Sequence, residues 1–449
     1  MIFSNRDLAA LIGPLVIEQL LTITLGFADI LMVSFLGEAA ISGVSLVDQI
    51  GVLFNGLFGA FATGGVVVCS HYIGAGKQRE VSVTAKQLIY TVLLFSLVLM
   101  VAGLLLRREA LRLIFGNLEA DVFENADIYF FYTLLGFPLI ALYSAFAALF
   151  RAQGNSGISM WTQLLINIMN IGGNAICIYG LRMGVEGVAI PTLIARGTAA
   201  VVLFVLLYNA RSYHGRPPVK ITGITKVFFD FRVIRQILAI GIPTGIENSV
   251  FQIGKILVIS LIATFGTSAI AANAAASTIC GLSVVPGSAI GLALLTVVGQ
   301  CLGANQVDEA AAAVKKLMIF VIIVEAALNI PYLFCGNLLL SLFNLQPATQ
   351  KTAWNLFIAH GVLCIFIWPL AWPFPNALRA ANDAKFTMIV SLASMWIVRF
   401  GFSHLFNIFT GWTIYGVWAA MFADWAVRAA FFIIRWKKGR WRTHYRFKE

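Results

Sequence analysis

Charged side chains are scarce in this sequence. Asp, Glu, Lys and Arg make up 11% of its 449 residues and hydrophobic residues make up 60%, whereas an ordinary soluble domain carries about 25% charged residues. So few polar side chains cannot cover a water-facing surface, which excludes a soluble globular protein. Apolar stretches of about 20 residues recur along the whole chain, the length that crosses a hydrocarbon core about 30 Å thick. The composition therefore predicts an all-α integral membrane protein.

The sequence also lacks the motifs of enzymes and of metal or nucleotide sites. Its six cysteines form no CxxC pair and no His cluster accompanies them, which argues against a disulfide framework or a zinc site. The segment 74–77 lacks the spacing of a phosphate-binding loop, and no Ser, His and Asp arrangement of a hydrolase occurs. The net charge of +11 comes from basic residues in short loops and a tail, as membrane topology requires. We expect no enzymatic activity, cofactor, metal, nucleic-acid partner or ATPase subunit.

Apolar stretches bounded by Gly, Pro and charged clusters predict twelve transmembrane helices. Their ranges are 8–36, 44–73, 83–106, 126–149, 158–180, 185–209, 233–264, 269–301, 311–334, 352–378, 385–408 and 413–436. Lys and Arg are concentrated at the N-terminus, in the connections after even-numbered helices and in the C-terminal tail. Cytoplasmic loops carry an excess of Lys and Arg, so we expect a multi-pass protein of the cell membrane with both termini cytoplasmic.

The chain repeats itself at an offset of 229 residues. Pro14 and Glu18 recur as Pro243 and Glu247. The same offset relates Gly37 to Gly266, Gly74-Ala75 to Gly303-Ala304 and Gly187-Val188 to Gly416-Val417, and an offset of 228 relates Arg151-Ala152 to Arg379-Ala380. One register held across separate segments indicates a duplicated unit.

The repeat predicts two parallel six-helix lobes, at residues 1–215 and 233–436. A cytoplasmic linker over 216–232 joins them, and a basic cytoplasmic tail covers 437–449. Because six is even, both lobes run in the same direction and are related by a pseudo-two-fold axis along the membrane normal. A central cleft between the lobes would hold a solute, and rocking of the lobes would give alternating access in a functional monomer.

Several short segments, in their order and spacing, resemble the multidrug and toxic compound extrusion (MATE) family. They are Pro14, Asp29, Met32 and Leu36-Gly37, then 72–76, 151–155, 187–189, 241–243, 298–300 with Gly303-Ala304, and 418–428. The resemblance covers nearly the whole chain. It implies secondary active export of amphipathic, often cationic, organic compounds or drugs in exchange for H⁺ or Na⁺. The alternatives are a lipid-linked precursor flippase of the same superfamily and a non-transporting membrane scaffold.

Three carboxylates in the first lobe are candidate coupling-ion sites, because an ionisable side chain at the bilayer centre costs about 2.5–3.5 kcal/mol. Asp29 matches the acidic position on the first helix that the resemblance implies is used in cation coupling; alternatively it only caps or hydrates the helix end. Asp48, whose repeat counterpart is Ser277, would complete a pair with Asp29. Glu18 either takes part in coupling or makes structural hydrogen bonds, as its twin Glu247 suggests.

Two residues of the seventh helix are candidates for substrate contact or gating. They are Glu247 and Lys255, eight residues apart in an otherwise apolar stretch. Lys255 would act as an internal counter-ion, select anionic solutes, or extend along a cavity wall towards water. Family members with an acidic residue deeper in the seventh helix would place it near Phe251, and the tenth predicted helix, 352–378, has no Asp or Glu. Both departures argue against coupling through the C-terminal lobe.

Four other charged residues in the spans have simpler interpretations. Asp424 and Arg428 are spaced i, i+4 on the last helix and are expected to pair. Arg196 and Arg399 are expected to brace packing or bind backbone carbonyls. No role is assigned to Glu325 or His360 from the sequence.

Overall fold

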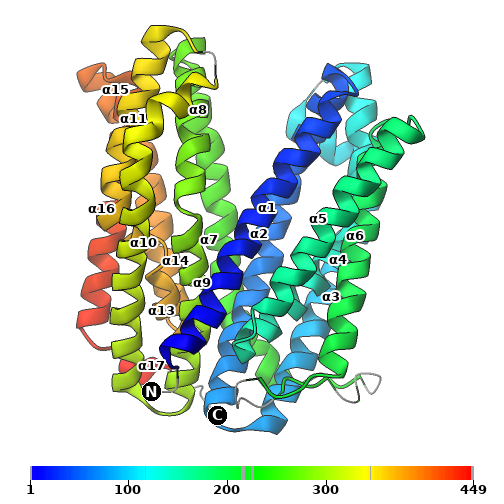
Figure 1. Ribbon diagram of the computed structural model, residues 1–449, viewed down its shortest axis with the longest axis vertical. Helices are drawn as coiled ribbons and strands as arrows, with labels where there is room; N and C mark the ends of the chain where they lie inside the picture. The colour runs from blue at the N-terminus through cyan, green and yellow to red at the C-terminus, as the bar shows by residue number, and fades with distance from the viewer. Residues whose placement is uncertain are drawn as a thin grey trace. The chain divides into compact units, whose positions relative to one another are not determined.

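The computed structural model describes residues 3–445 except residues 117, 214–217, 222, 224–226 and 344. Its regular elements are helices (Figure 1). The chain divides into two compact units at Gly245 and Ile246, within α7 (Phe231–Ala263). We refer to the residues before this point as the N-terminal unit and to those after it as the C-terminal unit. The predicted linker 216–232 and tail 437–449 lie partly outside the described residues.

The N-terminal unit consists of long helices and the first half of α7. They are α1 (Asn5–Ser34), α2 (Glu38–Gly74), α3 (Gln78–Phe115), α4 (Ala120–Gln153), α5 (Gly157–Ala175) continued by the π-helix η1 (Ile176–Gly180), and α6 (Glu186–Tyr208). α1 begins at Ser4, whose side chain accepts from the backbone N–H of Asp7 while the Asp7 side chain accepts from that of Ser4. α4 ends at Gly154, whose φ of 90° turns the chain into α5.

The C-terminal unit contains the second half of α7 and a larger number of shorter helices. They are α8 (Thr267–Ser283), α9 (Val285–Gly303), α10 (Val307–Ser341), α11 (Pro347–Phe366), α12 (Trp368–Ala371), α13 (Pro375–Ala380), α14 (Ala384–Ala393), the π-helix η2 (Ser394–Gly401), α15 (Phe402–Thr410), α16 (Thr413–Lys437) and α17 (Trp441–His444). Two predicted spans, 269–301 and 352–378, are therefore interrupted, whereas α14, η2 and α15 follow one another without a gap over the predicted span 385–408.

Proline explains the interruptions before α9 and before α12. Pro286 is the second residue of α9 and Pro369 the second residue of α12. Proline lacks an N–H and restricts the residue before it, so a new helix starts readily at each point. α11 and the helices that follow it are bent by 63°. The π-helix η2 does not break its span, but a π-helical turn is a feature often found at functional sites.

Ten helices among the described residues are long and apolar enough to span a membrane, and the bent pair around Ile367 makes eleven. The prediction of an all-helical membrane protein is confirmed. The predicted span 158–180 is helical but is not among these ten, because α5 carries buried amides such as Gln163 and Asn174 along one face.

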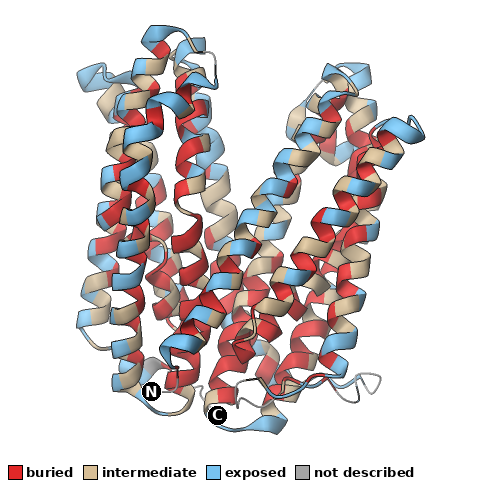
Figure 2. Cartoon of the chain, in the orientation of Figure 1, coloured by how far each residue is buried: buried red, intermediate tan, exposed pale blue. Residues whose placement is uncertain are grey.

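The long helices carry buried and exposed apolar residues along the same length (Figure 2). Leu113 on α3 and Phe334 on α10 are 88% and 84% exposed, whereas Val92 and Val321 on the same two helices are fully buried. Water would oppose exposure of so much apolar surface, and lipid tails would not. The exposed apolar faces therefore identify the lipid-facing side of these helices.

The repeat preserves a buried ion pair in each unit. Arg151 at the end of α4 lies 3.2 Å from Glu18 on α1, and Ser159 donates to the other oxygen of Glu18 at 2.6 Å. In the C-terminal unit Arg379 lies 2.8 Å from Glu247. These are the residues that the offset relates, so the duplication conserved the contact as well as the residue types.

Removing one partner of the N-terminal pair should strongly destabilise the protein. Arg151→Met leaves the buried Glu18 carboxylate without its cation, which costs about 3–5 kcal/mol. Adding Glu18→Leu should recover much of this loss, because no buried charge then remains unpaired. Thermal unfolding in detergent measures both effects, with Arg108→Met, at an exposed side chain, as a control that changes little. A melting temperature for Arg151→Met equal to that of wild type would contradict the structural role.

Candidate functional site

A cavity of about 310 Å³ lies inside the N-terminal unit among α1, α2, α4 and α6. We name it the Asp29 cavity. Two of the predicted coupling residues, Asp29 and Asp48, line it together with Tyr129 and Arg196. The fold thus brings together two carboxylates that the sequence places on different helices.

The turn between α1 and α2 explains why these two carboxylates meet. α1 ends five residues after Asp29, and α2 begins ten residues before Asp48. At 1.5 Å per residue they lie about 8 Å and about 15 Å along the helices from the turn. Gly37 in the turn has a φ of 102°, a conformation that favours glycine. Both side chains therefore reach the cavity from neighbouring helices that run in opposite directions.

α5 supplies a row of buried amides beside Asp29. Four amide side chains between Gln163 and Asn174 follow a spacing of four, three and four residues, which keeps them on one helix face. Asn174 donates to Asp29 Oδ1 at 2.8 Å and to Asn170 Oδ1 at 3.1 Å. Asn170 donates in turn to Thr192 Oγ1 on α6 at 2.6 Å. The side-chain oxygen of Asn174, Oδ1, is buried and accepts no hydrogen bond from a described residue.

The charges of the Asp29 cavity are not paired with one another. The Tyr129 hydroxyl donates to Asp48 Oδ1 at 3.3 Å. Arg196 lines the same cavity, yet no carboxylate oxygen of a described residue lies within 4 Å of its guanidinium. Likewise no described Lys or Arg nitrogen lies within 4 Å of the Asp29 or Asp48 carboxylate. Two carboxylates and one guanidinium therefore line the cavity without an ion-pair partner among the described residues.

Glu18 is not part of this cavity. Its carboxylate is buried against Arg151 and Ser159, near the junction of α4 and α5. Of the two roles that the sequence left open, these contacts favour the structural one.

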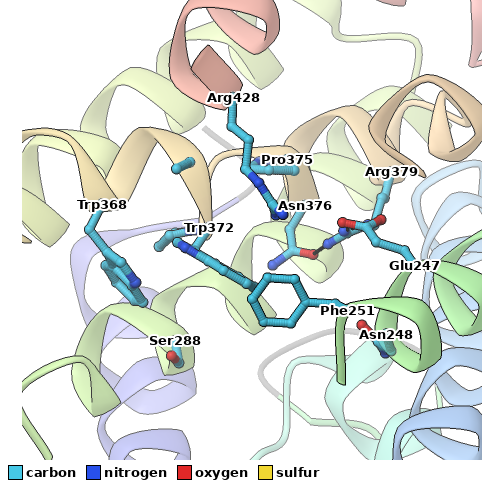
Figure 3. A pocket seen from close by; sticks show the side chains of 12 residues that line it. Glu247, Asn248, Phe251, Ser288, Trp368, Trp372, Pro375, Asn376, Arg379 and Arg428 are labelled. Atoms are coloured by element: carbon cyan, nitrogen blue, oxygen red, sulfur yellow. Dashed lines mark hydrogen bonds and ion pairs between the residues drawn. The ribbon is translucent and has the colours of Figure 1, made fainter. Parts of the chain in front are cut away.

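A second pocket, of about 200 Å³, lies inside the C-terminal unit (Figure 3). We name it the Arg428 pocket. The guanidinium of Arg428 lies over the rings of Phe251 and Trp372, 5.2 and 4.9 Å from their centres. Arg428 also pairs with Asp424 at 2.8 Å, which confirms the pairing expected from their i, i+4 spacing.

The charged residues that line the Arg428 pocket, unlike those of the Asp29 cavity, are all held in ion pairs. These residues are Glu247, Arg379 and Arg428, two cations to one carboxylate. In Figure 3 the side chain of Glu247 points towards that of Arg379, its ion-pair partner. Glu247 therefore contributes no unpaired charge to the pocket.

Two further cations lie near this pocket but do not line it. Lys255 is exposed about two turns beyond Glu247 on α7, and no described carboxylate lies within 4 Å of its amine. Arg399 on η2 lies over the ring of Phe251 at 5.6 Å, and its buried Nε has no hydrogen-bond partner among the described residues. The stacking on Phe251 agrees with the bracing role expected for Arg399.

Two features of the Asp29 cavity escaped sequence reasoning. The α5 amides follow an i, i+4, i+7, i+11 spacing, and that spacing would have indicated a polar face directed into the protein. Arg196 carries no comparable signal, because its neighbours in the cavity lie on α1 and α2, far away in the sequence. Among the described residues, no group of three or more His, Cys, Asp or Glu side chains could hold a metal ion.

A family model, MatE, matches residues 14–176 and again residues 243–405. The second match begins and ends 229 residues after the first, the offset of the internal repeat. The two matches together cover more than half of the chain.

Comparisons with individual proteins also extend over the full length. The chain is 28% identical to the uncharacterized transporter YisQ of Bacillus subtilis, over 97% of this chain and 94% of YisQ. It is 24% identical to the probable multidrug resistance protein NorM of Thermotoga maritima, over 97% and 93% of the two chains. Its fold matches the outward-facing conformation of a multidrug resistance MATE family transporter of the MOP superfamily, with a TM-score of 0.87 and 20% identity over 98% and 96% of the chains. The duplicated family match and these relatives show that the chain belongs to the MATE family of membrane transporters.

Proposed function

We propose that this transporter exports amphipathic, cationic organic compounds in exchange for H⁺ or Na⁺, and that Asp29 binds the coupling ion. The observation that carries the proposal is the environment of Asp29. Its carboxylate lines a cavity, accepts a hydrogen bond from Asn174, and has no described cationic side chain within 4 Å. A carboxylate in such a site binds a proton or another small cation when its surroundings change.

Asn174 supplies a way for Asp29 to exist in two states. In the present arrangement the Asn174 amide donates to Asp29 Oδ1, as suits an ionised carboxylate. A protonated Asp29 carries an O–H that needs an acceptor, and the Asn174 carbonyl oxygen lacks a donor. Reorientation of this one amide would therefore accommodate both states, and its bond to Asn170 would transmit the change along α5.

Competition for the same carboxylates would make the exchange obligatory. With Asp29 and Asp48 ionised and Arg196 charged, the lining of the Asp29 cavity carries one net negative charge, which attracts an organic cation. Binding of H⁺ or Na⁺ removes this attraction and favours release of the substrate. Each ligand then biases the conformational equilibrium only through its different affinity for the two states.

The remaining predicted site residues are proposed to act in the C-terminal unit or in the scaffold. Glu247, paired with Arg379 at the edge of the Arg428 pocket, would open or close that pocket as the pair breaks or forms. Lys255 would repel cations or attract an anionic group of the substrate. Glu18 would hold α1 to the end of α4 rather than bind the ion.

The names of relatives support the substrate class. NorM of Thermotoga maritima is named a probable multidrug resistance protein, and it aligns with 97% of this chain. The distribution of Lys and Arg supports a location in the cell membrane with both termini in the cytoplasm. Two fused lobes are enough to form a transport path, so we infer a functional monomer.

Replacing Asp29 with Asn should abolish ion-driven transport while leaving the protein folded. Asn keeps the shape and one acceptor of Asp but cannot bind a proton or balance a cation, so coupling is lost. The measurement is dye extrusion by purified protein in liposomes, under a pH gradient and separately under a Na⁺ gradient. Asp121→Asn, at an exposed position near the start of α4, is the matched control and should transport like wild type.

Two outcomes would contradict this assignment. Transport by Asp29→Asn at the wild-type rate would show that Asp29 is structural. Absence of dye flux in wild type under both gradients would remove the drug-export proposal and favour the flipping of lipid-linked precursors.

Asp48 should determine whether transport responds to membrane potential. Exchange of one H⁺ for one monovalent cation is electroneutral and gains about 1.4 kcal/mol per pH unit. A second proton bound at Asp48 would add about 2.3 kcal/mol per 100 mV. An inside-negative potential imposed with K⁺ and valinomycin should therefore stimulate wild type and leave Asp48→Asn unaffected. Equal stimulation of both proteins would exclude Asp48 as a second coupling site.

A further inference from the structure

A second isolated carboxylate lies deep in the C-terminal unit, on α10. Glu325 is fully buried, with 0% of its surface exposed. It accepts hydrogen bonds from the backbone N–H of Gly287 at 3.2 Å and from the Asn329 amide at 3.1 Å, and the Cys364 thiol lies 3.6 Å away. Three different helices, α9, α10 and α11, supply these donors.

No cation balances this carboxylate. Among the described residues no Lys, Arg or His nitrogen lies within 4 Å of Glu325. Among the described residues, the titratable side chain in contact with it is the Cys364 thiol on α11. Cys280 on α8 lies near Cys364, and His360 lies one turn before Cys364 on α11. His360 packs against Trp418 and Trp425 of α16, and its buried Nδ1 has no partner among the described residues. A negative charge here is offset by hydrogen-bond donors and a helix N-terminus but by no cation, so its burial remains costly.

Glu325 caps a helix that begins inside the membrane domain. Gly287 is the third residue of α9, where helical N–H groups have no intrahelical acceptor. The carboxylate of Glu325 supplies the missing acceptor, and the partial positive charge of the helix N-terminus favours its ionised form. The contact requires glycine, because a Cβ at Gly287 would lie 2.4 Å from Glu325 Oε1 and 2.5 Å from the Trp368 ring.

Trp368 links this cap to the second helix break. It is the first residue of α12, directly after the 63° bend of α11 at Ile367. A Cβ atom at position 287 would clash with both Glu325 and Trp368. Gly287, Glu325 and Trp368 are therefore packed against one another. The breaks before α9 and before α12 therefore meet at Glu325.

The Arg428 pocket borders this contact. Ser288 and Trp368 line that pocket and are both labelled in Figure 3. Ser288 directly follows Gly287, whose N–H bonds Glu325. The indole of Trp368 thus lies beside both the pocket and the Gly287 contact, and its movement would admit a proton.

We propose that Glu325 is a second proton-binding site, reached from the Arg428 pocket, whose protonation releases the N-terminus of α9 and loosens the two helix breaks of the C-terminal unit. Ionised Glu325 accepts three donors and holds α9, α10 and α11 together. Protonated Glu325 can accept fewer hydrogen bonds, and its own O–H needs an acceptor. The side-chain oxygen of Asn329, Oδ1, has no partner among the described residues and would supply that acceptor. Binding of a proton to Glu325 thus weakens the hydrogen bonds at the two helix breaks, before α9 and before α12.

This proposal goes beyond the proposed function. The part that Glu325 plays in transport rests on that function, but proton binding at Glu325 can be measured independently of it. Infrared difference spectra of purified protein in nanodiscs, recorded between alkaline and acid buffer, measure the binding directly. Wild type should show the C=O stretch of a buried protonated carboxylic acid appearing in acid. Glu325→Gln should lack this band, and Glu38→Gln, at an exposed position at the start of α2, should retain it.

Hydrogen–deuterium exchange tests the effect on the helix break. Acid should increase exchange of the α9 N-terminus, corrected for intrinsic rate, by about tenfold in wild type, the change expected when one charge-assisted hydrogen bond is lost. Glu325→Gln should show little pH dependence there. Identical infrared spectra for wild type and Glu325→Gln, or an unchanged pH dependence of exchange in Glu325→Gln, would overturn the proposal.

Asp29→Asn separates this site from the one in the Asp29 cavity. The variant should keep the Glu325 band even though it does not transport, because the two carboxylates lie in different units. Loss of the band in Asp29→Asn would show that Glu325 is not an independent proton site and would contradict the proposal. Normal transport by Asp29→Asn together with a retained band would refute only the proposed function.

Discussion

A charge inside hydrocarbon has no water to solvate it, and this cost decides how the ionisable residues of the protein are arranged. One set is paired within 4 Å. Four of these pairs join different parts of the chain, Glu18–Arg151, Asp127–Arg107, Glu247–Arg379 and Asp383–Arg435, and the fifth, Asp424–Arg428, lies within α16. A second set has no ion-pair partner among the described residues: Asp29, Asp48, Arg196, Lys255, Glu325 and Arg399. The paired charges hold the scaffold together, and the unpaired ones are the groups on which the proposals for ion and substrate binding rest.

Duplication conserved the scaffold and allowed these unpaired groups to diverge. The Glu–Arg ion pair occurs in both units at repeat-related positions. By contrast, the positions equivalent to Asp29 and Asp48 are Val258 and Ser277. The two cavities accordingly differ: the charges that line the Asp29 cavity have no ion-pair partner among the described residues, and those that line the Arg428 pocket are paired.

Much of this organisation could be predicted from the sequence, because hydrophobic length, loop charge and the repeat are visible in one dimension. The breaks at Val284 and Ile367 could not, since proline is tolerated inside other helices of the same chain, such as α1 and α7. The hydrogen-bond partner of Asp29 could not be predicted either, because Asn174 lies 145 residues away in the sequence. The role of Glu325 depends on a backbone N–H of Gly287, and a backbone group has no signature in the residue types.

Ion movement driven by substrate tests the central claim, exchange at Asp29, most directly. An organic cation is added to proteoliposomes that hold a trapped pH indicator, or a trapped Na⁺ indicator, with no ion gradient imposed. The account predicts that substrate entry expels the coupling ion, so that the lumen becomes alkaline or loses Na⁺, and that this signal is absent in Asp29→Asn. Substrate entry that moves neither ion, or an undiminished signal in Asp29→Asn, would contradict it.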